Sequence, residues 1–168
     1  MAKVYMMCGR ICSGKSTYAQ RLRKEHRAVV LSVDEITLAL FGGEPGDKLD
    51  DYVARTEKYL YGKSLEILEC GTDVVLDWGF WTRRERDEAR EFYGSRGIEY
   101  GFYYIDIADG EWARRIEKRN ELVLSGALEA YYVDEGLAKK FAEIFEKPGA
   151  DEGDISFTEG ESEVPAES

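Results

Sequence analysis

The chain has 168 residues, and its 34 acidic and 23 basic residues give a net charge of −11. This length suits one domain with a hydrophobic core, and the acidic charge argues against nonspecific nucleic-acid binding, which depends on Lys and Arg. No stretch approaches the ~18 consecutive apolar residues of a membrane-spanning helix. The short apolar start does not have the pattern of a secretory signal, and Cys8, Cys12 and Cys70 cannot all pair, so we expect a cytoplasmic protein.

The acidic charge is concentrated at the end of the chain. Residues 149–168 hold seven acids and no base, which leaves −4 for residues 1–148. Few apolar residues accompany these acids. We therefore expect one folded domain over 1–148 and a mostly disordered acidic tail over 149–168. Within the tail, only DISFT at 154–158 has the composition of a short edge strand.

Short apolar segments alternate with amphipathic ones along residues 1–148. In chain order, the pattern predicts a strand at 3–8, a helix at 15–25, a strand at 28–32, a helix at 34–40, a loop at 42–47, a helix at 50–70, a strand at 73–77, a helix at 82–96, a strand at 99–107, and helices at 109–119 and 134–145. Thr82 and Glu85 have the spacing of a capping box. This alternation predicts an α/β fold, in which a parallel sheet is covered by helices on both faces.

Residues 9–16, GRICSGKS, fit the phosphate-binding pattern G-x-x-x-x-G-K-[ST] between a predicted strand and a predicted helix. The glycines let backbone amides surround phosphate oxygens, and the helix N-terminus adds partial positive charge. In this pattern Lys15 reaches the β- and γ-phosphates, and the Ser16 hydroxyl binds Mg²⁺. We expect ATP and Mg²⁺ as ligands, although nothing in the pattern separates ATP from GTP. The predicted nucleotide-binding residues of this loop are Gly9, Arg10, Ile11, Cys12, Ser13, Gly14, Lys15, Ser16 and Thr17. Cys12 is interpreted either as a small side chain or as a redox-sensitive thiol.

Two aspartates follow buried strands at the sheet edge where open α/β folds bind ligands. Asp77 ends the third predicted strand and is a candidate for holding the metal and the acceptor. Asp34 follows the second strand and opens the next helix. Each also has a structural interpretation, because aspartate is common at strand ends and caps helices well. Their shared position beside the phosphate loop favours a role in the reaction.

Arg115 and Arg119 lie one helical turn apart and therefore share a face of their predicted helix. They are candidates for a mobile lid that clamps a transferring phosphoryl group and contacts the nucleotide. The alternative is a solvated helix on which Glu111 and Glu117 pair with these bases.

Three further residues are candidates for contacting an acceptor. Trp78 and Trp81 follow Asp77 directly, and aromatic rings at a polar edge either stack on an acceptor or belong to the core. Arg55 lies on the long predicted helix that we expect to border the same pocket as Asp34.

Five segments together resemble a known group: CGRICSGKSTYAQRL, LSVDEITLAL, VVLDWGFWTRRERDEAR, WARRIEKRN and YYVDEGLAKKFAEIFEKP. They resemble the P-loop kinases that include polynucleotide 5′-hydroxyl kinase, chloramphenicol phosphotransferase and the zeta toxins, and most closely the predicted-kinase, AAA-type ATP-binding branch. The resemblance covers most of residues 1–148. It implies a three-layer P-loop NTPase fold with a sheet of about five parallel strands, the phosphate-loop strand beside the Asp77 strand, and a small helical lid.

The resemblance also assigns roles. It implies that Asp34 is the general base that deprotonates the acceptor hydroxyl, and that Arg115 and Arg119 are lid arginines. Polynucleotide kinases of the group carry an arginine three residues after the base, where this chain has Thr37. This departure and the acidic charge disfavour nucleic-acid ends as acceptors.

We therefore expect an ATP- and Mg²⁺-dependent phosphotransferase that acts on a hydroxyl of a small-molecule or nucleotide-like acceptor. The alternatives are a nucleotide-dependent NTPase switch that acts on a protein partner, with the acidic tail as its docking segment, and a protein that only binds ATP. The identity of the acceptor and the oligomeric state are not evident from the sequence.

Overall fold

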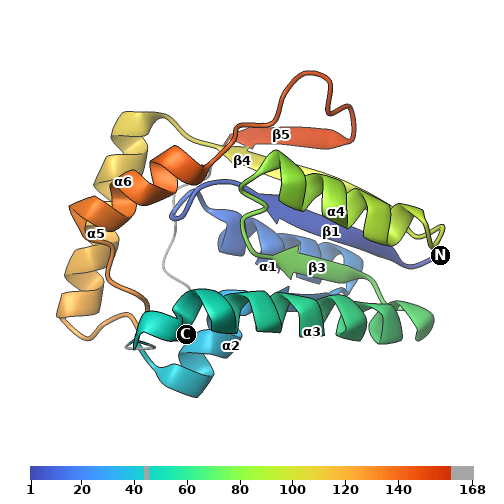
Figure 1. Cartoon of the computed structure of the whole chain (residues 1–168), viewed down its shortest axis with the longest axis horizontal. Coiled ribbons are helices and arrows are strands. Elements are labelled where there is room, and N and C mark those ends of the chain that lie inside the picture. Colours follow the sequence, from blue (N-terminus) through green and yellow to red (C-terminus); the bar gives the residue numbers. More distant parts are fainter. Residues whose placement is uncertain (44–45, 160–168) are drawn as a thin grey trace.

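The computed structural model describes residues 1–43 and 46–159. Its centre is a five-stranded sheet in the order β2-β3-β1-β4-β5, in which every pairing is parallel (Figure 1). The strands are β1 (Lys3–Cys8), β2 (Val29–Ser32), β3 (Val74–Asp77), β4 (Glu99–Asp106) and β5 (Ile155–Glu159). The expected α/β class is confirmed, and the phosphate-loop strand β1 lies beside β3, as the resemblance implied.

Helices connect these strands and cover both faces of the sheet. They are α1 (Lys15–His26), α2 (Val33–Phe41), α3 (Leu49–Glu69), α4 (Arg83–Gly94), α5 (Asp109–Leu124) and α6 (Glu135–Ile144), with a 3-10 turn at Gly46–Lys48. Among the described residues, no helix is long and apolar enough to cross a membrane. The capping box at Thr82 and Glu85 is present at the start of α4.

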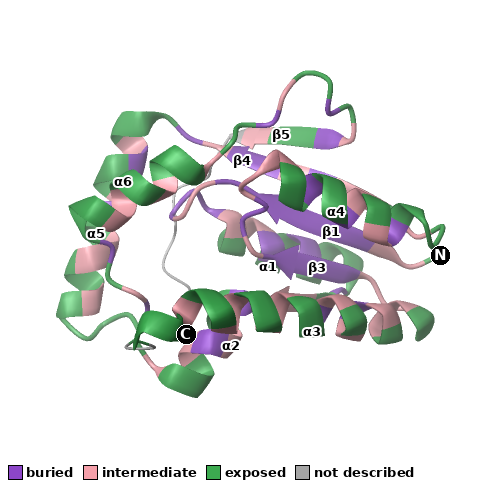
Figure 2. Ribbon diagram, in the orientation of Figure 1, coloured by how far each residue is buried: buried purple, intermediate pink, exposed green. Residues whose placement is uncertain are grey.

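Two apolar layers explain why β1 and β3 were recognisable as continuous apolar runs. Val4 and Met6 face one core layer, which α3 and α4 cover. Tyr5 and Met7 face the opposite layer, which α1 covers. Figure 2 shows the central strands buried between helices whose outer sides are exposed. Strands buried on both faces carry apolar residues at successive positions, unlike the alternating pattern of a half-exposed strand.

A third apolar cluster joins α5 and α6 to the phosphate loop. Trp112 and Ile116 of α5 pack with Val133 and with Cys12 of the loop, and Phe141 of α6 joins them. Both helices lie beyond the carboxyl ends of the strands (Figure 1). This pair is the small helical lid that the resemblance implied.

Residues 149–159 belong to the fold, where a mostly disordered tail was expected, and β5 is the short edge strand for which 154–158 had the composition. β5 pairs with β4 from Phe102↔Ile155 to Asp106↔Glu159. Glu152 is 5% exposed and pairs with Arg86, which lies 66 residues earlier. The composition of this segment predicted disorder because the basic residues that pair with its acids lie far away in the sequence. The rest of the expected tail, residues 160–168, lies outside the described residues.

Candidate active site

The phosphate loop has the backbone that its glycines permit. Gly9 has φ +151°, its N–H donates to the Gly79 carbonyl at 3.0 Å, and a Cβ there would lie 2.9 Å from the Ile105 carbonyl oxygen. Gly14 has φ +100° and caps α1. Lys15 Nζ donates to the Arg10 carbonyl at 2.7 Å, which places the ammonium against the loop. The helix N-terminus, the loop amides and this ammonium form an anion cradle.

Two buried polar atoms beside the loop lack partners. Ser13 is 1% exposed, and within residues 1–43 and 46–159 its Oγ has no hydrogen-bond partner. Arg119 Nε is also buried and without a partner in that part of the chain. Buried donors are rarely left unsatisfied. Phosphate oxygens would accept from both, so the residues present fit a nucleotide.

Asp77 lies at the end of β3 beside the start of α1. It is 8% exposed, and the nearby Ser16 side chain favours its ionised form. Burial raises the pKa of Asp77, while Lys15 and Ser16 oppose the rise. Burial lowers the pKa of Lys15, against Asp77 and Asp34. A hydroxyl and a carboxylate are donors of the kind that Mg²⁺ prefers, so Ser16 and Asp77 fit the expected metal ligands.

A cavity of about 320 Å³ opens in front of the loop. It brings together most of the predicted site residues: Ile11, Cys12, Gly14, Lys15, Ser16, Asp34, Asp77, Trp78, Trp81 and Arg119. The same cavity is lined by residues that the sequence analysis did not select: Asp50, Val53, Glu57, Phe80, Glu85, Tyr131, Val133, Leu137, Lys140 and Phe141.

Asp34 is exposed in the first turn of α2 and lines this cavity. The helix cap is Ser32, whose Oγ accepts from the Glu35 N–H at 3.2 Å. The capping alternative considered for Asp34 therefore does not account for its position. Its charge acts on both Lys15 and Asp77.

The two predicted lid arginines contact the loop differently. Arg119 lines the cavity, with Nη1 3.8 Å from Cys12 Sγ. Arg115 does not line it, but donates from Nη1 to the Ser13 carbonyl at 3.3 Å and from Nε to Glu111 at 2.7 Å. The predicted alternative of pairing with Glu111 is thus present together with a contact to the phosphate loop.

Arg55 lies apart from the other predicted residues. Its side chain is 78% exposed on α3, pairs with Asp51 at 2.9 Å and does not line the cavity. Val53 and Glu57 on the same helix do line it. Because a helix turns about 100° per residue, a residue midway between two cavity-facing positions points away. Glu57 lies on the inward face of α3, between Val53 and buried Leu60. An acidic residue within this otherwise apolar face was the sequence signal that could have identified Glu57 as a cavity residue.

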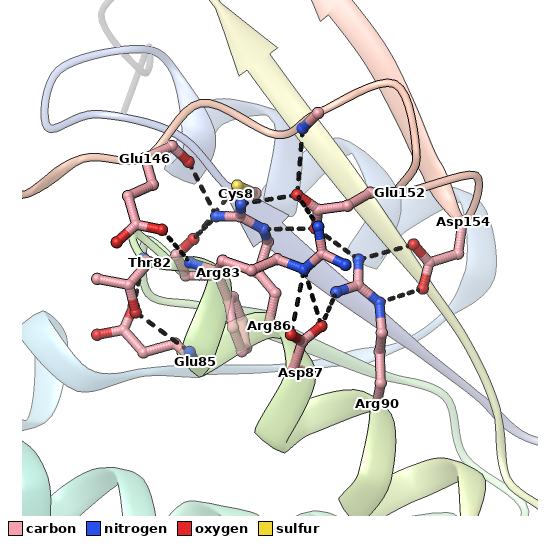
Figure 3. A network of polar contacts seen from close by, with 12 residues as sticks. Cys8, Thr82, Arg83, Glu85, Arg86, Asp87, Arg90, Glu146, Glu152 and Asp154 are labelled. Carbon is pink, nitrogen blue, oxygen red and sulfur yellow. Dashed lines mark hydrogen bonds and ion pairs between the residues drawn. The ribbon is translucent and has the colours of Figure 1, made fainter.

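Arg86 binds the backbone of the loop that carries Trp78 and Trp81. Figure 3 shows Arg86 and its polar contacts. Arg86 is 1% exposed, and its Nη1 donates to the carbonyls of Phe80 and Glu146, both at 3.0 Å. Phe80 has φ +45°, which is uncommon for a side chain of its size. Arg86 Nε and Nη2 donate to Glu152, each at 2.8 Å. The buried guanidinium therefore stabilises a strained turn that shapes the aromatic side of the cavity.

A larger hollow of about 760 Å³ lies at the end of β4. Its charged side chains already have partners: Arg10 pairs with Asp109 at 2.8 Å, Lys147 with Asp106 at 3.1 Å, and Glu111 with Arg114 and Arg115. The cavity at the phosphate loop, where polar groups lack partners, is the candidate active site.

Solved structures with this fold include several kinases. A candidate kinase of Chloroflexus aurantiacus J-10-fl has a TM-score of 0.71 at 17% identity, over 94% of this chain and 85% of that chain. A gluconokinase of Sinorhizobium meliloti 1021 has a TM-score of 0.62 at 16% identity, over 96% and 84%. The APS kinase CysC of Mycobacterium tuberculosis, in complex with AMPPNP and APS, has a TM-score of 0.64 at 18% identity, over 96% and 90%. At such identities the similarity establishes the fold.

The sequence comparisons agree with this fold. None of the curated proteins compared with the chain matches it. The model of the AAA domain family matches residues 4–131, a span that includes the phosphate loop, Asp34, Asp77, Arg115 and Arg119. Because this match covers most of the chain, the chain belongs to the AAA domain family.

Proposed function

We propose that the protein is an ATP- and Mg²⁺-dependent kinase that phosphorylates a hydroxyl group of a small acceptor. The observation that carries this proposal is that Asp34 and Lys15 line one cavity, together with Asp77 and Ser16. Asp34 lies in the first turn of α2 and shares the cavity with Lys15, where a carboxylate is suited to accept a proton.

In this proposal the acceptor oxygen forms a bond to the γ-phosphorus, and the bond from that phosphorus to the β–γ bridging oxygen breaks. The hydroxyl proton passes to Asp34, and ADP leaves. Lys15 and Arg119 offset the negative charge of the phosphoryl group. Ser16 and Asp77 would hold Mg²⁺, which supplies charge neutralisation for the phosphates when bound.

The position of Thr37 supports a small acceptor over a nucleic-acid end. Thr37 is fully buried, and its Oγ1 accepts a hydrogen bond from Tyr131 at 3.0 Å. Where polynucleotide kinases of the group have an arginine that contacts an acceptor phosphate, α2 has the Thr37 hydroxyl. Its hydrogen bond with Tyr131 connects α2 to the segment before α6.

The test is incubation with γ-labelled ATP and fractionated metabolites and oligonucleotides. We expect label in a small hydroxyl compound. Lys15→Ala should lose both transfer and ATP binding. Asp34→Asn should keep ATP binding and lose about 10²–10⁴-fold in rate. Asp51→Asn, an exposed aspartate outside the cavity, serves as the matched control and should retain activity.

Two results would contradict the proposal. Full turnover by Asp34→Asn would remove Asp34 from the reaction. Release of phosphate from ATP with no labelled acceptor in any fraction would favour the NTPase alternative.

A further inference from the structure

The lining that α3, α4 and α6 contribute to the cavity is mainly acidic. Among its described lining residues it has three carboxylates, Asp50, Glu57 and Glu85, and one cation, the exposed Lys140 of the lid. Asp34 adds a further negative charge near the loop. An anionic group on an acceptor would therefore meet mainly like charge, in contrast to the cradle around Lys15.

Glu57 is the most informative of these carboxylates. It is half-buried on the inward stripe of α3, between Val53 and Leu60. In the described part of the chain, no hydrogen bond or ion pair reaches its side chain. Burial first, and then the charges of Glu85 and Glu88 on α4, together raise the pKa of Glu57 to about 7. A carboxylate in this position is destabilising unless a cation accompanies it.

Aromatic rings border the same space. The Trp78 ring packs edge-on against Tyr61, one helical turn after Glu57, with centroids 5.6 Å apart. Trp78 also stacks on Phe80 at 5.5 Å. Trp78 and Phe80 both line the cavity. An aromatic face beside an unpaired carboxylate attracts ammonium groups, through the ring quadrupole as well as the ion pair.

We propose that the acceptor is a hydroxyl compound bearing an amine, such as an amino alcohol or amino sugar, whose ammonium binds Glu57 beside Trp78 while its hydroxyl faces Asp34. This inference rests on the proposed kinase function and names the substrate class for that site. The transfer step is the one written above, because the amine is a recognition group and takes no part in it.

The proposal has a consequence for pH dependence. Only the ionised Glu57 attracts an ammonium, so the KM for an amine acceptor should fall as the pH rises through about 7. The groups that face Glu57 are Glu85 and Glu88 from α4 and Tyr61 on its own helix; Asp50 and Lys140 share the cavity. Most of these groups are carboxylates, and their negative charge favours the protonated form of Glu57. The KM for an amine acceptor should therefore fall, and not rise, as the pH increases.

The experiment compares acceptors matched in shape and different in charge. Glucosamine, glucose and gluconate form one set, and serinol, glycerol and glycerate form another. Each is assayed with γ-labelled ATP at pH 6, 7 and 8. We expect labelled product from the amines, with kcat/KM at least about tenfold above the neutral counterparts and no product from the anions.

Substitution of Glu57 tests the recognition group directly. Glu57→Gln should raise the KM for the amine by about tenfold or more, reduce the preference for the amine over its neutral counterpart, and remove the dependence of KM on pH. Glu66→Gln, an exposed α3 glutamate paired with Lys63 and outside the cavity, is the matched control and should behave as wild type.

The outcomes separate the two proposals. Equal or better transfer to a neutral or anionic counterpart overturns the inference and leaves the kinase function in place. An unchanged pH profile in Glu57→Gln also overturns the inference alone. Absence of transfer to every acceptor, with no effect of Lys15→Ala on ATP consumption, overturns the proposed function itself.

Discussion

Replacing Glu152 with Gln isolates the buried ion pair that joins α4 to the chain before β5. The side chains of Arg86 and Glu152 are each 1% exposed, and two hydrogen bonds of 2.8 Å connect them. Burial alone would raise the pKa of Glu152, but hydrogen bonds from Arg86 and Arg90 outweigh burial and lower it from 4.5 to about 2. At about 1.4 kcal/mol per pH unit, this corresponds to about 3 kcal/mol of folding free energy. Removal of one partner from a buried pair costs about 3–5 kcal/mol, which agrees.

The assay is urea unfolding followed by tryptophan fluorescence. Because the folded-state pKa is depressed, the contribution is present above pH 4.5 and is lost as the pH falls through about 2. Glu152→Gln should therefore be about 3 kcal/mol less stable at pH 7 and only about 1–2 kcal/mol less stable at pH 3. Asp151→Asn is the control, since Asp151 pairs with Arg83 at the surface, and it should unfold like the wild type. A difference below about 1 kcal/mol at pH 7, or one independent of pH, would refute the reasoning.

Three further substitutions test other local features. Glu57→Gln should stabilise the protein by about 1–2 kcal/mol at pH 8, measured by thermal unfolding, but not at pH 4. Because the pKa of Glu57 is raised on folding, its contribution to stability is complete below pH 4.5 and is lost as the pH rises through about 7. An equal gain at both pH values would argue against burial as the cause. Arg27→Gly should stabilise the protein by about 1 kcal/mol in urea unfolding, since exposed Arg27 ends α1 at φ +54°, and a loss of stability would contradict this. Tyr131→Phe removes the 3.0 Å bond to buried Thr37 and should cost about 1–2 kcal/mol in the same assay, whereas unchanged unfolding would show that the bond contributes nothing.

Local sequence was sufficient for the features whose signals are local. The strand KVYMMC is apolar from Val4 to Cys8 and VVLD from Val74 to Leu76, all of which the doubly covered sheet buries, and the spacing of Thr82 and Glu85 fixes the start of α4. The phosphate loop was identified by residue types at fixed spacing. The common position of Asp34 and Asp77 followed from parallel strands, whose carboxyl ends meet at one edge of the sheet.

Features that depend on distant partners were missed. The acids Glu152 and Asp154 indicated disorder because their partners Arg86 and Arg90 lie more than 60 residues earlier, in α4. Arg55 was placed at the pocket because its helix borders it, and the error lies in the rotation of the helix about its own axis. For the same reason, the sequence analysis did not identify Glu57 as a residue that faces the cavity.

The strand order gives β1 a particular position in the sheet. Strands adjacent in sequence form two pairs, β2 with β3 and β4 with β5, and β1 alone lies between these pairs. Without β1, two separate ribbons would remain with no ladder between them. A nucleotide bound to the loop at the end of β1 would therefore stabilise both pairs of strands at once. Amide hydrogens of β3 and β4 should exchange with solvent through one shared opening, and ATP should slow exchange in both by the same factor.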